Sequence, residues 1–275
     1  MLDPYAELIG DPVEHSLSPA IHGHWLKTLG LAGSYRAVRC PPETLGAYLG
    51  SRLPDPLWRG CNVTMPLKEK AAAWLDWLED GAARSGAVNC IVPRNGRLHG
   101  FNTDIDALLG ALDAIDMEGK RTVVLGSGGA ARAALIALGQ RKADRVVLAR
   151  DPDKRLTLRA LGGDIECAPL YAIREALEGA AFIINATPLG MAGAEEMPLS
   201  ILEELQQASP ITLAIDLVYR PVETEFLSTS RAAGMQTVDG LTLLIGQARR
   251  AFELFFGTAP PPGDEALRTA LLQAG

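Results

Sequence analysis

The chain has 275 residues, of which 48% are hydrophobic and 21% charged, so its composition is that of an ordinary globular protein. Its formal net charge is −7 and no block of lysines and arginines occurs, which argues against nucleic acid or an anionic membrane surface as a partner. No apolar run approaches the ~18 residues of a membrane span, and the first residues lack a secretory pattern. Two compact domains are expected, because single cores stop growing near ~250 residues.

The four cysteines are far apart and show neither metal-binding nor redox spacing. They are Cys40, Cys61, Cys90 and Cys167. We therefore expect reduced structural thiols, no metal site and a cytoplasmic location.

Short apolar strands alternate with helical patterns along most of the chain, which predicts an α/β fold with largely parallel strands. In chain order the predicted strands are Ala6–Ile9, Ser34–Arg39, Cys61–Val63, Thr122–Leu125, Arg145–Ala149, Phe182–Asn185 and Thr212–Asp216. Helices are predicted between them, for example Pro19–Leu29 and Gly128–Leu138. Near the end, Gly240–Phe256 has apolar residues at helical spacing, and the cluster Ala259–Gly263 separates it from a last helix.

Two hydroxyls, Ser16 and Ser18, stand directly before the first helix. Ser18 followed by Pro19 has the pattern of a capping serine, whereas Ser16 has no such explanation. Hydroxyls suit a small hydroxylated or carboxylated substrate. His22 and His24 are interpreted as surface or core histidines, since no third metal ligand stands at suitable spacing.

A lysine and an aspartate carry the pattern of proton-transfer groups. Lys68 closes the run Gly60–Lys68, and Asp104 ends Gly100–Asp104 just before an apolar helical segment. Together with the glycine turn downstream they indicate hydride transfer assisted by the protein. Two alternatives stay open, namely a solvated Lys68 on a helix begun by Pro66 and an N-capping Asp104.

The turn Gly126-x-Gly128-x-x-Ala131 follows an apolar strand and opens a helix, which is the context of the dinucleotide fingerprint. The first glycine permits a tight turn, the second lets the backbone approach a pyrophosphate, and the small third residue lets helix and strand pack closely. The helix N-terminus offers N–H groups to the phosphates. We predict nucleotide binding here, the alternative being a turn required only for packing. A domain boundary is expected near Asn102–Asp106.

The end of the next strand carries opposing signals for the adenosine ribose. Arg150 and Lys154 suit a 2′-phosphate, while Asp151 suits a free 2′-hydroxyl or simply caps a helix.

A series of ordered motifs resembles the shikimate dehydrogenase family over almost the whole length. They are Ile9-Gly-Asp-Pro-x-x-His-Ser-x-Ser-Pro19, Asn62-Val-Thr-x-Pro-x-Lys68, Gly86-Ala-Val-Asn89, Asn102-Thr-Asp104, Gly126-Ser-Gly-Gly-Ala-x-Arg132, Asn185-Ala-Thr, Asp216-x-x-Tyr219-x-Pro221-x-x-Thr224 and Gly240-Leu-x-x-Leu-x-x-Gln247. The resemblance implies a parallel-sheet α/β substrate domain of residues 1–103 and 240–275, with an inserted Rossmann-like NAD(P)-binding domain of residues 104–239.

The resemblance also implies roles for individual residues. Lys68 and Asp104 form the catalytic pair, and Ser16 and Ser18 hold the substrate carboxylate. The residues implied around the ring and its hydroxyls are Thr64, Asn89, Tyr219 and Gln247, although Gln247 taken alone reads as a boundary residue of its helix. The residues implied at the cofactor are Gly126, Ser127, Gly128, Gly129, Ala130, Arg150, Asp151, Lys154, Thr187 and Gly240.

The implied activity is the reversible reduction of 3-dehydroshikimate to shikimate, with NADP(H) preferred and NAD(H) as the second cofactor. A paralogue acting on quinate or an aminoshikimate, and a non-catalytic nucleotide-binding sensor, are the alternatives. The expected partner is a small-molecule substrate, with a homodimer also considered. The chain departs from the family pattern at Gly23, Cys90 and Ala149–Asp151. The departures at Gly23 and Cys90 are expected to adjust only the local side-chain packing. The departure at Ala149–Asp151 weakens the case for strict NADP dependence.

Overall fold

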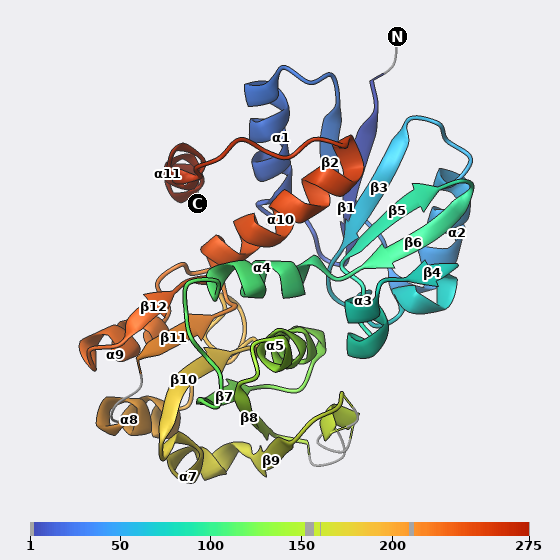
Figure 1. Ribbon diagram of the computed structural model, residues 1–275. Coiled ribbons are helices and arrows are strands. Elements are labelled where there is room, and N and C mark those ends of the chain that lie inside the picture. Colours follow the sequence, from blue (N-terminus) through green and yellow to red (C-terminus); the bar gives the residue numbers. More distant parts are fainter. Residues whose placement is uncertain (1–2, 152–156, 160, 209–211, 275) are drawn as a thin grey trace. The chain divides into compact units, whose positions relative to one another are not determined.

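The computed structural model describes residues 3–151, 157–159, 161–208 and 212–274. The chain divides into two compact units, the first made of Met1–Asp106 and Ile245–Gly275 and the second of Ala107–Leu244. The boundaries between units fall within two helices, α4 (Thr103–Ala111) and α10 (Gly240–Phe256) (Figure 1).

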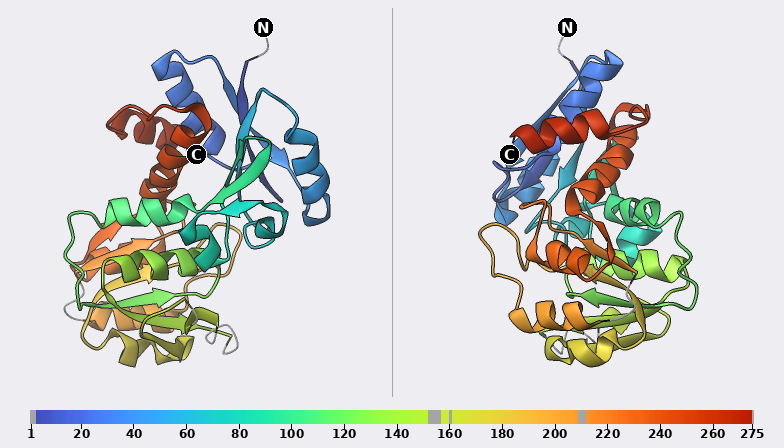
Figure 2. Two further views of the ribbon diagram at one scale, coloured as in Figure 1. Left: turned by 45° about the vertical axis from the view of Figure 1, so that its right-hand side comes forward. Right: turned by 90° about the vertical axis from the view of Figure 1, so that its left-hand side faces the viewer.

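The first unit is built on a six-stranded sheet with the order β2-β1-β3-β5-β6-β4. Its strands are β1 (Tyr5–Gly10), β2 (Ser34–Arg39), β3 (Trp58–Val63), β4 (Trp77–Leu78), β5 (Cys90–Arg94) and β6 (Arg97–Phe101). Its remaining helices are α1 (Ser18–Leu29), η1 (Pro42–Thr44), α2 (Leu45–Arg52), η2 (Ala71–Trp74), α3 (Asp80–Ser85) and α11 (Glu265–Ala274). Leu45 and Leu49 of α2 cover one face, while Ala251 and Phe255 of α10 cover the other (Figure 2).

One hairpin departs from the parallel arrangement of this sheet. β5 pairs antiparallel with both β3 and β6, whereas β1 pairs parallel with β2 and β3. The turn between β5 and β6 is Asn95-Gly96, with φ of 51° and 72°. A two-residue Asn-Gly turn with positive φ at both positions joins antiparallel strands, so this local signal explains a feature absent from the sequence expectation.

The second unit is a six-stranded parallel sheet with the order β12-β11-β10-β7-β8-β9. Its strands are β7 (Arg121–Leu125), β8 (Asp144–Ala149), β9 (Ile165–Pro169), β10 (Ala180–Asn185), β11 (Leu213–Asp216) and β12 (Gln236–Val238). Its described helices are α5 (Gly129–Gln140), η3 (Leu170–Ala172), α7 (Ile173–Leu177), α8 (Leu199–Gln207) and α9 (Glu225–Ala232). The last three pack on one face, and α5 lies on the other (Figure 1).

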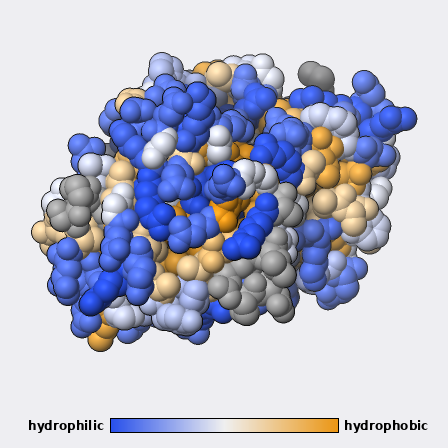
Figure 3. All heavy atoms as spheres, turned by 60° about the horizontal axis from the view of Figure 1, so that its bottom comes forward, coloured by the Kyte–Doolittle hydropathy of each residue, from blue (hydrophilic) through white to orange (hydrophobic). Residues whose placement is uncertain are grey.

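The α/β fold class is therefore confirmed, and every predicted strand appears within one residue at its carboxyl end. The sequence expectation did not include β4, β5, β6, β9 or β12. All four cysteines are free thiols, as expected. None of the described helices is long and apolar enough to cross a membrane. Hydrophilic residues dominate the face shown in Figure 3, with apolar residues in smaller areas between them.

A buried carboxylate holds the outer part of the first sheet together. Glu7 on β1 has a side chain that is 0% exposed, and it accepts hydrogen bonds from Arg36 Nε (2.9 Å), Arg52 Nε (2.9 Å) and the Tyr48 hydroxyl. Burial alone would raise the pKa of Glu7, but the hydrogen bonds from Arg52, Tyr48 and Arg36 outweigh it and hold the pKa below its ordinary value. Ionised Glu7 therefore stabilises the fold at neutral pH. That stabilisation is lost as the pH falls through the folded-state pKa.

Glu7→Gln is expected to lower the free energy of unfolding at neutral pH by about 1.5–3 kcal/mol, the usual size of hydrogen bonds to a charged group. The deficit should shrink in acid, because the wild-type carboxyl then becomes neutral as well. Chemical denaturation at neutral and acidic pH measures both values. Glu43→Gln, at an exposed glutamate of the same unit, is the control and should change little. A deficit of equal size at both pH values would contradict the assignment.

Candidate active site and nucleotide-binding turn

The candidate catalytic residues of the first unit gather where several strands end. β1 and β3 run parallel and finish at Gly10 and Val63, and the Asp11 N–H donates to the Met65 carbonyl just beyond them. β5 and β6 alternate in direction, so Asn89 before β5 and Asn102 after β6 reach the same edge. The sheet topology thus brings four separate motifs of the sequence together.

Lys68 and Asp104 form an ion pair. Lys68 Nζ lies 2.6 Å from Asp104 Oδ2, and the two side chains are 25% and 19% exposed. Lys68 stands in the turns that follow β3 rather than on a helix, so the alternative of a solvated helical lysine is wrong. The Asp104 carboxylate does not cap α4 either, because Asn102 Oδ1 accepts from the Asp104 N–H. A partly exposed ammonium held by a carboxylate can stabilise or protonate an oxygen that gains negative charge.

The side-chain amide of Asn89 fixes the position of Asp104. It is 2% exposed and donates to Asp104 Oδ1 at 2.8 Å and to Thr103 Oγ1 at 3.0 Å. Its own oxygen accepts from the Thr103 N–H at 2.7 Å. Thr103 Oγ1 in turn donates to Gln247 Oε1 at 3.3 Å, so Gln247 belongs to the same network. Thr103 was not among the predicted site residues, although it stands inside the Asn-Thr-Asp motif.

Ser16 and Ser18 also lie together, with Oγ atoms 3.2 Å apart. Their local roles are the reverse of the expected ones. Leu17 is the N-cap of α1, with Ser18 already helical, and Ser16 Oγ accepts from the Ser18 N–H at 3.2 Å. The capping interpretation of Ser18 is therefore wrong.

Tyr35 and Asn62 extend this network and were not predicted as site residues. The buried Tyr35 hydroxyl donates to Asn62 Oδ1 at 2.8 Å, and Asn62 Nδ2 donates to the Asn89 carbonyl at 3.1 Å. Burial raises the pKa of Tyr35 well above its ordinary value, and a hydrogen bond with Ser18 works against that shift. Nothing in the local sequence around Tyr35 indicates these contacts, since they join residues far apart in the chain.

His22 is a core histidine, as interpreted from the sequence. Its ring stacks on Tyr35 with centroids 4.0 Å apart, and burial lowers its pKa to about 3. Its imidazole therefore stays neutral at physiological pH.

Thr64 packs against the glycine of the first motif. A Cβ at Gly10 would lie 2.4 Å from Thr64 Cγ2, so only glycine allows this approach. A Cβ at Gly23 would meet nothing within 4 Å. Close packing therefore does not account for the departure at Gly23, contrary to expectation. Cys90 is fully buried, as a packing role requires.

The glycine turn of the second unit stands at the point where the strand order reverses. β7 is flanked by β8 and β10, and in such sheets ligands bind beyond the carboxyl ends of the strands at this point. Gly126 has φ of 113°, and a Cβ there would lie 2.8 Å from the Ala186 carbonyl oxygen. A Cβ at Gly128 would meet nothing within 4 Å, and Ala131 is fully buried.

The predicted cofactor residues around this turn share its edge of the sheet. Ser127, Gly128, Gly129 and Ala130 are partly exposed at the start of α5. Thr187 follows β10, and its Oγ1 donates to Asn185 Oδ1 at 2.6 Å.

Arg150 and Asp151 follow β8 at the same edge, and both are exposed. Arg150 Nη1 donates to Glu195 Oε2 at 2.8 Å, a partner that no local pattern predicted. Lys154 lies outside the described residues.

Tyr219 and Gly240 lie next to each other in the second unit. A Cβ at Gly240 would come within 2.8 Å of the Tyr219 nitrogen and closer still to the Val218 carbonyl. The segment is anchored by buried Asp216, which accepts from the Val218 N–H at 3.0 Å and from Thr224 Oγ1 at 2.6 Å. Burial raises the pKa of Asp216 to about 6 and also raises that of Tyr219.

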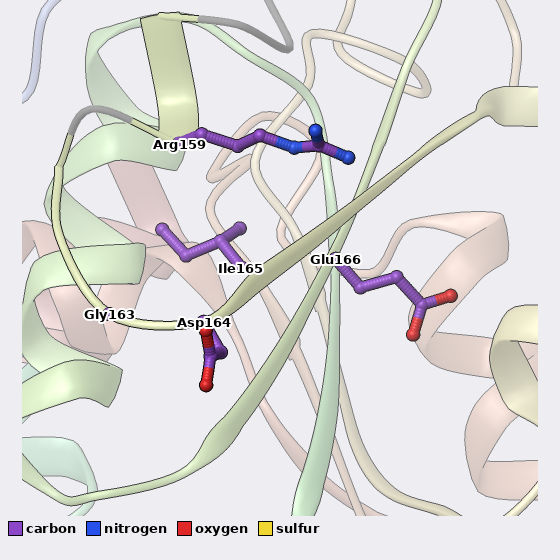
Figure 4. Close-up of a pocket in the computed structure, with 5 residues that line it drawn as sticks. All are labelled: Arg159, Gly163, Asp164, Ile165 and Glu166. Carbon is purple, nitrogen blue, oxygen red and sulfur yellow. The ribbon is translucent and has the colours of Figure 1, made fainter.

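A surface pocket of about 420 Å³ lies beside β9 in the second unit. It is lined by Arg159, Gly163, Asp164, Ile165 and Glu166 (Figure 4). Ile165 begins β9 and pairs with the start of β8, which is the opposite edge from Arg150. The pocket therefore does not belong to the nucleotide-type turn. Among the described residues no group of three or more His, Cys, Asp and Glu side chains could hold a metal ion.

The fold defines a class, the two-unit α/β proteins whose second unit has the doubly wound parallel sheet and glycine turn of dinucleotide-binding proteins. The sequence model of the shikimate dehydrogenase substrate binding domain matches residues 8–91. A relative from Sphingopyxis alaskensis named shikimate dehydrogenase (NADP(+)) is 45% identical, over 98% of this chain and 97% of its own. The chain belongs to the shikimate dehydrogenase family.

Solved structures of the same family have a similar fold. The shikimate 5-dehydrogenase from Thermus thermophilus in complex with NADP(H) and shikimate is 39% identical, with a TM-score of 0.80 over 97% of this chain and 99% of that one. The enzyme from Listeria monocytogenes in complex with shikimate and NAD is 28% identical, with a TM-score of 0.85 over 98% of this chain and 96% of that one.

The two glycines of the turn should respond differently to the same substitution. Gly126→Ala is expected to lower the free energy of unfolding by about 2 kcal/mol or more, because it forces a Cβ against backbone at positive φ. Gly128→Ala should cost less than about 1 kcal/mol, since its Cβ meets only open space at the helix N-cap. Urea denaturation followed by circular dichroism compares the two. Equal losses would refute this account of the turn.

Proposed function

We propose that the chain catalyses the reversible reduction of 3-dehydroshikimate to shikimate with NADP(H) as the preferred cofactor and NAD(H) as the second. The observation that carries this proposal is the Lys68–Asp104 ion pair at 2.6 Å, held by the buried amide of Asn89. The relatives' names and the compounds bound in their structures support the same activity. They do not favour quinate or an aminoshikimate, and a sensor would not need the proton-transfer pair.

The first unit is proposed as the substrate domain and the second as the cofactor domain. Carboxylate recognition is assigned to Ser16 and Ser18, whose paired hydroxyls suit a charged acceptor. The proposed contacts to the ring and its hydroxyls come from Thr64, Asn89, Tyr219 and Gln247.

The residues of the second unit fit a dinucleotide. Gly128 leaves open space where a side chain would stand, the first turn of α5 presents N–H groups, and Arg150 provides a cation beyond β8. Gly126, Ser127, Gly129, Ala130, Asp151, Thr187 and Gly240, together with Lys154 outside the described residues, complete the proposed set. When bound, the reduced nicotinamide supplies the hydride.

Lys68 acts where the ketone oxygen becomes negative. Its ammonium stabilises that oxygen and donates the proton that completes the hydroxyl, and in the reverse direction it takes the proton back. Asp104 keeps the lysine in place and accepts from the substrate hydroxyl. Asn89 orients Asp104 by donating to its second oxygen.

The free thiols favour a reducing compartment, so we assign the chain to the cytoplasm. The homodimer considered from the sequence remains a prediction that sedimentation velocity can check.

Lys68→Ala should lower kcat by at least ~100-fold with a modest change in KM, because the ammonium interacts most strongly with the transition state. Asp104→Asn should behave similarly. Lys70→Ala, at an exposed lysine two positions on, is the matched control and should retain activity. The assay follows reduced nicotinamide with shikimate and with quinate. A rise in KM with kcat intact would make the pair binding residues only, and faster turnover of quinate would overturn the substrate assignment.

Arg150→Ala should lower the ratio of kcat/KM for NADP to that for NAD by roughly 10- to 100-fold, the worth of a charge-assisted hydrogen bond to phosphate. Asp151→Thr should raise the ratio, since a carboxylate beside a 2′-phosphate is repelled. Steady-state kinetics with both cofactors give the ratios. If the wild-type protein prefers NAD by tenfold or more, the weighting of these charges is wrong.

A further inference from the structure

The loop between β10 and α8 presents a carboxylate to Arg150. Glu195 Oε2 accepts from Arg150 Nη1 at 2.8 Å, although the two residues are 45 positions apart in the chain. Their side chains are 71% and 64% exposed. The arginine proposed to bind a 2′-phosphate is therefore already paired with an anion.

The backbone of this loop holds Glu195 in place. The Gly190 N–H donates to the Glu195 carbonyl at 2.8 Å, and the Ala194 N–H donates to the Met191 carbonyl at 2.9 Å. Gly190 and Gly193 both have φ of 81°, a conformation that glycine adopts without strain. The Ala192 N–H donates to the Arg220 carbonyl at 2.8 Å, which ties the loop to the segment after β11. The carboxylate thus comes from an ordered turn.

We propose that Glu195 lowers the preference for a 2′-phosphorylated cofactor by competing with the 2′-phosphate for Arg150. This inference rests on the proposed function, since it takes Arg150 as the phosphate-binding cation. A cofactor with a 2′-phosphate must displace Glu195 from Arg150, and the displaced carboxylate still lies near a phosphate with about two negative charges. A cofactor with a free 2′-hydroxyl leaves the Arg150–Glu195 pair intact.

The strengths of these interactions indicate that Glu195 weakens the binding of a 2′-phosphate without preventing it. An exposed ion pair changes an equilibrium constant by no more than about fivefold, and the interaction of two charges ~4 Å apart in water changes it by about fivefold. A bidentate arginine–phosphate contact is stronger than the pair it replaces. Glu195 therefore lowers the preference for NADP without reversing it.

Glu195→Gln tests this directly. It should raise the NADP-to-NAD ratio of kcat/KM by about threefold to tenfold, mainly through a lower KM for NADP. Glu196→Gln removes the same charge one residue further on, at an exposed glutamate, and is the matched control. Its ratio should stay within twofold of the wild-type ratio. A general loss of stability would affect both cofactors alike and leave the ratio unmoved.

Calorimetry with nucleotide fragments gives a readout independent of turnover. Adenosine 2′,5′-bisphosphate should bind Glu195→Gln about threefold to tenfold more tightly than the wild-type protein, while 5′-AMP should bind both equally. In an Arg150→Ala background the gain from Glu195→Gln should shrink, because the ion pair is already absent.

The outcomes separate this inference from the function on which it rests. If Arg150→Ala weakens the bisphosphate but Glu195→Gln leaves its affinity and the cofactor ratio within twofold of wild type, the competition is refuted and the proposed function stands. An equal gain in Glu196→Gln would also refute it, because the effect would then be general electrostatics. If Arg150→Ala leaves the bisphosphate affinity unchanged, both the competition and the proposed role of Arg150 fall. If the wild-type protein oxidises shikimate with neither NADP nor NAD, the proposed function itself is wrong.

Discussion

The candidate catalytic site depends on the hydrogen bonds made by the side-chain amide of Asn89. The amide is buried, and it uses its N–H groups and its oxygen at once, on Asp104 and on both the backbone and side chain of Thr103. A buried amide without hydrogen-bond partners would destabilise the folded state. Any movement of Asp104 or Thr103 that breaks these hydrogen bonds therefore costs free energy. The position of Asp104, and with it the geometry of the Lys68–Asp104 pair, is therefore fixed by Asn89. The network continues from the Asn89 carbonyl through Asn62 to the Tyr35 hydroxyl.

The two units hold their functional residues in physically different ways. The candidate site residues of the first unit are buried or half-buried, and a hydrogen bond in such a low-dielectric setting is stronger than the same bond in water. Arg150 and Glu195 in the second unit are exposed, so their pairing competes with solvent and with any bound anion. A site that must orient a reacting oxygen benefits from the first arrangement. A site that distinguishes two cofactors differing by one phosphate can be adjusted through the second.

Much of the fold followed from local signals in the sequence. The strand, glycine turn and helix from Val123 to Leu138 were predictable because apolar periodicity and glycine spacing act over a few residues. The Asn95-Gly96 turn is an equally local signal of a hairpin, but the predicted strands do not include the antiparallel β5 and β6 that it joins. The capping interpretation of Ser18 and the two alternatives for Lys68 and Asp104, a solvated helical lysine and a helix N-cap, are wrong. Tertiary hydrogen bonds, rather than helix ends, decide where those side chains point.

Contacts between distant residues could not be read from the sequence in the same way. Lys68 and Asp104 were paired by the family motifs, but nothing near Tyr35 or Glu195 indicates a partner, since those partners depend on how strands and loops return to one edge of a sheet. Gly126 and Gly128 lie between these two cases, because their roles could be predicted only in part from the sequence. Spacing marked Gly126 and Gly128 as a pair, yet only the positions of neighbouring atoms show that one is required by the fold and the other leaves open space.

Two of the three buried thiols of the first unit, Cys61 and Cys90, lie on opposite faces of its sheet. Cys61 packs with the layer that contains Leu45 and Leu49 of α2, and Cys90 packs with the layer that contains Ala251 and Phe255 of α10. Burial raises the pKa of both thiols, so neither offers an accessible thiolate to an alkylating reagent while its layer is closed. Their rates of modification therefore report separately on the opening of each helical layer, and the chain carries a natural pair of probes for the order in which the two layers detach from the sheet.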